Sequence, residues 1–213
     1  MTIRTITHGS LGFWFEFGST YSYLSASRIQ DVAAASGVNV SWEPFLLGPI
    51  FKEQGWGDSP FNIYPAKGRY MWRDVERLCE RYGISFVRPS RFPRSSVLAS
   101  RVACLVASEP WLPEFVRAVF RANFAENREI SDDRVIKSVL DSLGQPGEQL
   151  VEKALSPENK QRLRAQTERA MRLGIFGAPS FVVGEELFWG NDRLEDAVAW
   201  YEAHATTKTL PGS

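Results

Sequence analysis

An aromatic strand turns into a helix in the stretch Phe13-Trp14-Phe15-Glu16-Phe17-Gly18-Ser19-Thr20-Tyr21-Ser22-Tyr23-Leu24. Its first five residues are apolar except for Glu16, and Gly18 follows them, which favours a short buried strand. Apolar and small residues then recur at helical spacing from about Thr20 to Ala35, with Gly37 as a stop signal. A second apolar run at 38–45 completes a β-α-β unit, which we expect to be parallel and right-handed.

The rest of the chain is predicted to form a loop, a helical block and a final β-β-α unit. Turn-forming residues from Gly48 to Pro65 predict a loop. Hydrophobic periodicity then predicts helices at 67–82, 95–108, 111–126, 132–141, 147–154 and 156–172. Residues 180–183 and 187–189 form a predicted hairpin. The last helix is expected to open at Asn191 or Asp192 and to end near His204.

This order of elements predicts an α/β protein with a thioredoxin-like fold, β-α-β followed by β-β-α, and a large all-helical insertion. We expect residues 10–64 and 156–205 to form the thioredoxin-like domain and residues 65–155 to form the helical insertion. A chain of 213 residues is long enough for such a domain with its insertion.

Composition narrows the class of protein. Lys plus Arg and Asp plus Glu both number 25, so no overall field attracts nucleic acid or an anionic membrane. The N-terminus lacks the pattern of a secretory signal, and a cytoplasmic location is the default expectation. Cys79 and Cys104 lack CxxC spacing and read as inert core thiols. With two histidines, His8 and His204, the chain offers little for a metal site, and none is expected.

The middle of the chain is locally basic. The cationic residues there are Lys67, Arg69, Arg73, Arg77, Arg81, Arg88, Arg91, Arg94 and Arg101. A solvated helix face, partly balanced by Asp74, Glu76 and Glu80, explains such a run in most proteins. Attraction of an anionic small molecule is the functional alternative.

Several runs of sequence carry a family resemblance. They are Phe15 to Leu24, Phe45-Leu46-Leu47-Gly48 with Phe51-Lys52, Pro65 to Met71 with Arg73-Asp74, Phe176 to Phe181, and Phe188 to Leu194. In this order they resemble the 2-hydroxychromene-2-carboxylate isomerase family, which is close to kappa-class glutathione transferases within the DsbA-like thioredoxin superfamily. The matches extend from about residue 13 to residue 200. Thr20 departs from the pattern, because many members have proline after the serine.

The resemblance implies glutathione as cofactor and Ser19 as the catalytic residue. By itself, a serine before a helix is an N-cap. A helix start also favours an anion, and a hydroxyl there can donate a hydrogen bond to the glutathione thiolate and lower the pKa of the thiol. The implied cofactor-binding residues are Ser19, Ala178, Pro179, Trp189, Gly190, Asn191 and Asp192. The Ala178-Pro179 bond is expected to be cis, so that the main chain of Ala178 pairs with the cysteinyl backbone.

The resemblance also implies that the substrate is a small aromatic carboxylate. Members of the family place a lysine and an asparagine near the organic substrate, which here correspond to Lys52 and Asn62. Phe92 is a candidate for an aromatic wall of the same site, together with Trp56 and Tyr64. A homodimer is expected from the resemblance, without nucleic-acid or membrane partners.

The function implied is that of a glutathione-dependent isomerase. The thiolate would add reversibly to a conjugated carbon of an aromatic 2-oxo acid, a single bond would rotate, and glutathione would be regenerated. A kappa-like transferase, lyase or peroxidase is the nearest alternative, and a non-catalytic glutathione-binding protein is another. A disulfide oxidoreductase lacks its cysteine at position 19, and a serine hydrolase lacks the G-x-S-x-G motif.

Overall fold

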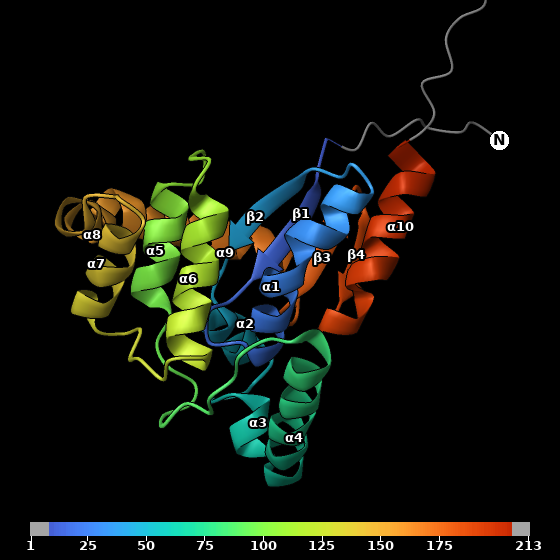
Figure 1. Ribbon diagram of the computed structural model, residues 1–213, viewed down its shortest axis with the longest axis horizontal. Helices are drawn as coiled ribbons and strands as arrows, with labels where there is room; N and C mark the ends of the chain where they lie inside the picture. The colour runs from blue at the N-terminus through green and yellow to red at the C-terminus, as the bar shows by residue number, and fades with distance from the viewer. Residues whose placement is uncertain (1–8, 206–213) are drawn as a thin grey trace, which may run out of the picture.

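A four-stranded mixed sheet forms the centre of the computed structural model, which describes residues 9–205 (Figure 1). The strand order is β2-β1-β3-β4. Strand β1 (Leu11–Phe15) is parallel to β2 (Val40–Pro44) and antiparallel to β3 (Ser180–Val183), and β3 pairs with β4 (Glu186–Trp189). The predicted parallel β-α-β unit and C-terminal hairpin are therefore confirmed, as is the thioredoxin-like α/β fold.

Helices cover both faces of the sheet. Helix α1 (Thr20–Ala35) and helix α10 (Leu194–Ala205) lie on one face, where Phe13 and Phe15 join the main apolar core (Figure 1). On the other face, Trp14 packs in a second cluster with residues of α2 (Leu47–Glu53) and α9 (Pro157–Arg172). The alternation of Phe13, Trp14 and Phe15 between the two faces follows from the period of two in a β-strand.

The remaining helices lie beside and below the sheet (Figure 1). They are α3 (Pro60–Ile63), α4 (Pro65–Tyr82), α5 (Val97–Leu105), α6 (Leu112–Phe124), α7 (Asp133–Ser142) and α8 (Gly147–Ala154). Phe120 of α6 packs against Phe15 and Phe17, with ring centroids 6.1 and 5.1 Å apart. This aromatic contact attaches the helical block to the end of β1 that carries the turn into α1.

Three expectations about element boundaries were wrong. The predicted loop at 48–65 contains α2 and the short helix α3 (Pro60–Ile63), because Pro49 and Pro60 stand in first turns, where helices tolerate proline. Strand β1 ends at Phe15, so Glu16 belongs to the turn. Residues Asn191–Arg193 form a 3₁₀ turn, and α10 begins only at Leu194.

The cysteines behave as expected of core thiols. Burial raises the pKa of Cys79 to about 11 and that of Cys104 to about 12, so neither thiol ionises near neutral pH. His8 lies outside the described residues. Within residues 9–205, none of the helices combines the length and the apolar character needed to cross a bilayer.

Candidate functional site

Ser19 is the N-cap of α1, and its hydroxyl group makes two hydrogen bonds. The Oγ atom accepts from the backbone N–H of Ser22 at 3.1 Å and donates to the carbonyl oxygen of Ala178 at 3.0 Å. The side chain is only partly buried. The second bond connects residues 159 positions apart in the sequence. It therefore brings the start of the first helix and the segment before β3 into one site.

The segment before β3 is held by the turn that follows β4. The Ala178-Pro179 peptide bond is cis, as expected. The N–H of Gly190 donates to the Pro179 carbonyl at 3.0 Å, and a Cβ at Gly177 would lie 2.4 Å from Trp189 Nε1. A side chain at 177 would displace the Trp189 ring, so glycine permits this close approach. Ala178, Pro179 and Gly190 are thus brought together.

The other residues predicted to bind glutathione lie in different surroundings from one another. The Asn191 side chain is buried, and its Oδ1 accepts from Ser25 Oγ at 3.1 Å and from Arg28 at 3.4 Å. Its side chain is therefore engaged within the protein, and its main-chain carbonyl accepts from the N–H of Leu194. Asp192 is exposed and pairs with Arg193 at 3.2 Å. Trp189 is 52% exposed and packs on Phe176.

The polar groups around Ser19 fit an anionic, peptide-like ligand such as glutathione. Helix α1 has 16 residues and no acidic residue in its first turn, so its positive end is not neutralised from within the helix. Ser22 Oγ is buried and has no hydrogen-bond partner among the described residues. The N-terminus of α1 thus provides a field that favours an anion such as a thiolate.

Of the three predicted substrate residues, the structure brings two together. Asn62 Nδ2 donates to the Phe92 carbonyl at 3.2 Å and to Asp58 at 3.1 Å. Lys52 is exposed on α2, and its ammonium group has no hydrogen bond or ion pair to any described residue. The Trp56 ring lies against Phe51, with centroids 5.6 Å apart. Asn62 and Phe92 are therefore connected by a hydrogen bond, and Lys52 is not part of this pair.

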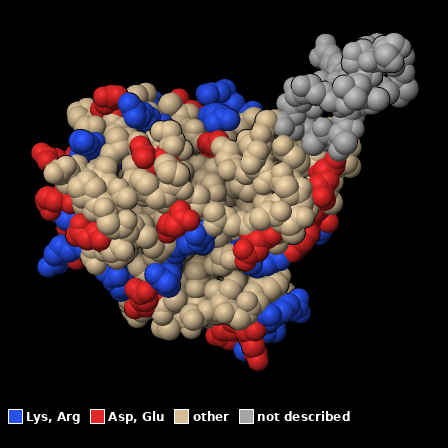
Figure 2. Space-filling view, turned by 45° about the horizontal axis from the view of Figure 1, so that its top comes forward, with Lys and Arg blue, Asp and Glu red and all other residues tan. Residues whose placement is uncertain are grey.

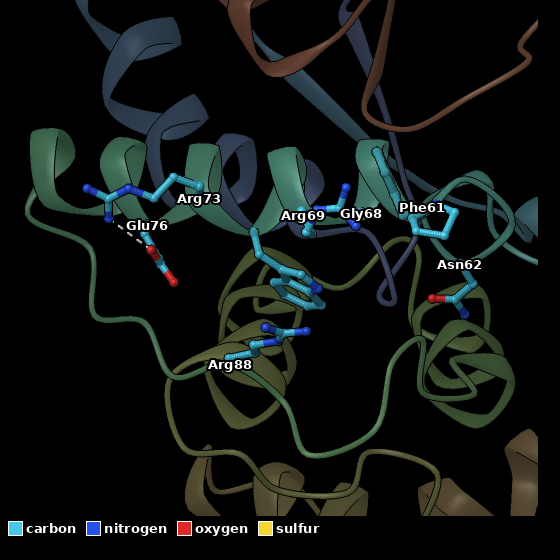
Figure 3. Close-up of a pocket in the computed structure, with 9 residues that line it drawn as sticks. Phe61, Asn62, Gly68, Arg69, Arg73, Glu76 and Arg88 are labelled. Atoms are coloured by element: carbon cyan, nitrogen blue, oxygen red, sulfur yellow. Dashed lines mark hydrogen bonds and ion pairs between the residues drawn. The ribbon is translucent and has the colours of Figure 1, made fainter.

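A pocket of about 550 Å³ opens between α4 and the segment that follows it (Figure 3). It is lined by Phe61, Asn62, Pro65, Gly68, Arg69, Trp72, Arg73, Glu76 and Arg88. Arg73 pairs with Glu76 at 2.9 Å, whereas the Arg88 guanidinium lies 4.7 Å from the centre of the Trp72 ring. The lining thus combines aromatic rings with more cations than anions.

Ser19 does not line this pocket. Residues 92 and 93 lie between Ser19 and the pocket. The Phe92 ring contacts Trp72 at a centroid distance of 4.7 Å. On the other side, a Cβ at Gly18 would lie 3.4 Å from Cβ of Pro93. Residues 92 and 93 therefore touch both the pocket wall and the turn that carries Ser19.

The basic residues in the middle of the chain lie in different surroundings. Arg69, Arg73 and Arg88 line the pocket, whereas the Arg94 side chain is buried and bonds to Asn123, Asn127 and neighbouring carbonyls. On the face shown in Figure 2, cationic and anionic groups are interspersed. Arg69 and Arg88 line the pocket without an ion-pair partner among the described residues.

Comparison with known proteins identifies the family. A family described as "DSBA-like thioredoxin domain" matches residues 10–201. The chain belongs to this family.

Enzymes of two kinds are among the relatives of this DsbA-like protein. The chain is 26% identical to a 2-hydroxychromene-2-carboxylate isomerase of Sphingobium xenophagum, over 87% of its own length and 94% of the relative's. It is 27% identical to human glutathione S-transferase kappa 1, over 85% and 86% of the two chains. A solved 2-hydroxychromene-2-carboxylate isomerase superimposes with a TM-score of 0.82 at 25% identity, covering 89% of this chain and 93% of that one. The chain is thus related to isomerases and glutathione transferases.

Glu16 is a buried group of the DsbA-like site to which the sequence assigned no role. Its side chain is 8% exposed, and burial raises its pKa from 4.5 to about 7, although Ser96 and a hydrogen bond from Gly18 act in the opposite direction. The signal was present in the sequence as a lone charged residue within an aromatic run, three positions before Ser19. A carboxyl group in that position is either paired or has a raised pKa.

Proposed function

We propose that this protein is a glutathione-dependent enzyme that isomerises aromatic 2-oxo acids of the hydroxychromene-carboxylate type at Ser19. One observation carries the proposal: the Ser19 hydroxyl group lies at the start of a 16-residue helix and bonds to the carbonyl of Ala178, which precedes Pro179. The relationship to isomerases and kappa-class transferases supports the same reaction class. A cytoplasmic location and a homodimeric state belong to the same proposal.

Bound glutathione would supply a thiolate nucleophile that adds to the conjugated acid and is expelled again. The protein's own contribution begins with the proton of Ser19 Oγ, which the carbonyl of Ala178 accepts at rest. Because a hydroxyl group has one hydrogen, Ser19 must release this carbonyl before it can donate to a sulfur anion. A peptide N–H of the ligand is a suitable replacement donor for Ala178. Main-chain recognition and thiolate stabilisation are therefore coupled through one hydrogen bond.

Recognition of the organic acid is proposed for the side of the site formed by Asn62 and Phe92. The adjoining pocket supplies the guanidinium groups of Arg69 and Arg88, neither of which has an ion-pair partner among the described residues. A guanidinium group matches the two oxygens of a carboxylate better than an ammonium does. Lys52, although exposed, remains the alternative counter-charge.

The test of the reaction is a mass balance. Purified protein is incubated with glutathione and 2-hydroxychromene-2-carboxylate, and the acid and the total glutathione are followed by ultraviolet absorbance and mass spectrometry. Isomerisation converts the acid while free glutathione stays constant. Consumption of glutathione with chlorodinitrobenzene, and no conversion of the chromene acid, would instead favour the kappa-like transferase. Binding of glutathione with neither reaction would support a non-catalytic protein.

A further inference from the structure

Glu16 holds the turn from which Ser19 projects. Its Oε2 accepts from the N–H of Gly18 at 2.8 Å, and its main-chain carbonyl accepts from the N–H of Ser19 at 2.9 Å. Within residues 9–205, no other Asp or Glu side chain is buried. The carboxyl group of Glu16 therefore fixes, from inside the protein, the two residues that lead into α1.

The same carboxyl group also connects this turn to the segment before α5. Ser96, which is buried, lies near the Glu16 carboxyl group and acts to lower its pKa. A Cβ at Gly18 would lie 2.9 Å from Glu16 Oε2 and 3.4 Å from the Arg94 carbonyl oxygen. Only glycine leaves space for the carboxyl group between the turn and this segment. Glu16 is thus enclosed on both sides.

Among residues 9–205, no cation compensates the charge of Glu16 in this enclosure. The groups facing it are the Gly18 amide and the Ser96 hydroxyl. Arg94 is close through its main chain, but its guanidinium group turns to Asn123 and Asn127 and pairs with Glu129 at 3.4 Å. Burial without a counter-charge accordingly raises the Glu16 pKa to about 7, so both of its charge states are populated near neutral pH.

We propose that Glu16 is a positioning residue that sets, through its charge and its bond to Gly18, how strongly the start of α1 holds an anion beside Ser19. This inference rests on the proposed function. The neutral carboxyl group leaves the positive end of the helix uncompensated, which favours a thiolate. The carboxylate places a negative charge in the same turn and disfavours one. By linkage, an anion bound beside Ser19 keeps Glu16 protonated to a higher pH.

The test is a pH titration of bound glutathione by ultraviolet absorbance of the thiolate, with affinities measured by calorimetry. We compare the wild-type protein with Glu16→Gln, and with Glu53→Gln as a control at an exposed glutamate of α2. Above about pH 7, Glu16→Gln is expected to hold the thiolate roughly tenfold more tightly than the wild type, as one pKa unit corresponds to a tenfold change. Glu53→Gln should match the wild type. S-methylglutathione, which has no ionisable thiol, should bind the wild type and Glu16→Gln equally at every pH.

The possible failures can be told apart. A thiolate that titrates identically in the wild type and in Glu16→Gln overturns the inference and leaves the proposed function intact. Absence of any bound thiolate overturns both. If Glu16→Gln does not fold, infrared spectroscopy of the wild type follows the protonated carboxyl band instead. Its midpoint should rise when glutathione binds and stay in place with S-methylglutathione, and an unchanged midpoint with glutathione contradicts the inference.

Discussion

At the scale of single residues, Ser19 combines two roles that the sequence could not separate. As an N-cap it satisfies the Ser22 N–H, and as a donor it reaches Ala178. Its identity and position were predictable from the strand-to-helix pattern and the resemblance. Its resting partner was not, because that contact depends on how residues 178 and 179 pack beside α1.

The first prediction separates these roles with Ser19→Ala. Loss of the cap should cost about 1 kcal/mol of unfolding free energy. Loss of the donor should lower kcat with the chromene acid by about 100- to 1,000-fold, as removal of a transition-state donor does in other enzymes. Ser156→Ala is the matched control, because Ser156 caps α9 by the same kind of bond. It should lose similar stability and keep its kcat. Equal activity in the two variants would remove Ser19 from the reaction.

The second prediction locates the counter-charge of the substrate. Arg88→Gln should raise KM for the chromene acid by about tenfold, the effect of losing one charge-assisted hydrogen bond, with kcat nearly unchanged. Arg81→Gln, on α4 outside the pocket lining, serves as the control. KM and kcat of these variants are measured by steady-state kinetics at low salt. A rise in KM with Lys52→Gln and none with Arg88→Gln would assign recognition to the lysine instead.

At the scale of elements, the strongly periodic helices were predicted well. Helix α1 has the predicted bounds of Thr20 to Ala35, and α8 those of residues 147 to 154. The helices α2 and α3 were missed because glycine and proline recur throughout 48–65, and tertiary contacts outweigh that local signal. Ile50, for example, is buried in one cluster with Trp14 of β1 and with Phe45, which follows β2.

The close contact between α3 and α4 gives a third prediction. A Cβ at Gly68 of α4 would lie 2.2 Å from the Phe61 carbonyl oxygen, so the helices approach through this glycine. Gly68→Ala should force them apart and cost about 1–3 kcal/mol of unfolding free energy, measured by urea denaturation. Gly48→Ala is the control, since nothing lies within 4 Å of a Cβ there. A similar small effect of both substitutions would show that the contact is not tight.

At the scale of the whole molecule, Glu16 gives a fourth prediction, for the dependence of stability on pH. Its folded-state pKa of about 7 lies above the ordinary value of 4.5, so the folded protein binds the proton more tightly than the unfolded chain. The stabilisation is complete below about pH 4.5 and is lost as pH rises through about 7. This difference corresponds to roughly 3 kcal/mol.

Urea denaturation at about pH 5 and about pH 8 checks this dependence. Between these conditions, the wild type should lose unfolding free energy relative to Glu16→Gln, because all other titrating groups are shared. Parallel changes in the two proteins would show that Glu16 is not buried as the structure has it. This stability effect came from three-dimensional burial and could not be read from the sequence alone.

The architecture as a whole was predictable because each layer leaves a local pattern: an apolar strand, periodic helices and a hairpin. The site was only partly predictable, because Ser19, Ala178 and Gly190 come from distant segments that the sheet order brings together. A residue that acts through its burial, such as Glu16, is visible in the sequence only as a polar position within an apolar run.

The most direct test of the central claim is a crystal structure of the wild-type protein with glutathione. The account predicts the cysteinyl sulfur within hydrogen-bonding distance of Ser19 Oγ, with the ligand backbone paired to Ala178. Glutathione bound elsewhere, or Ser19 Oγ still donating to the Ala178 carbonyl with the sulfur remote from it, would contradict it.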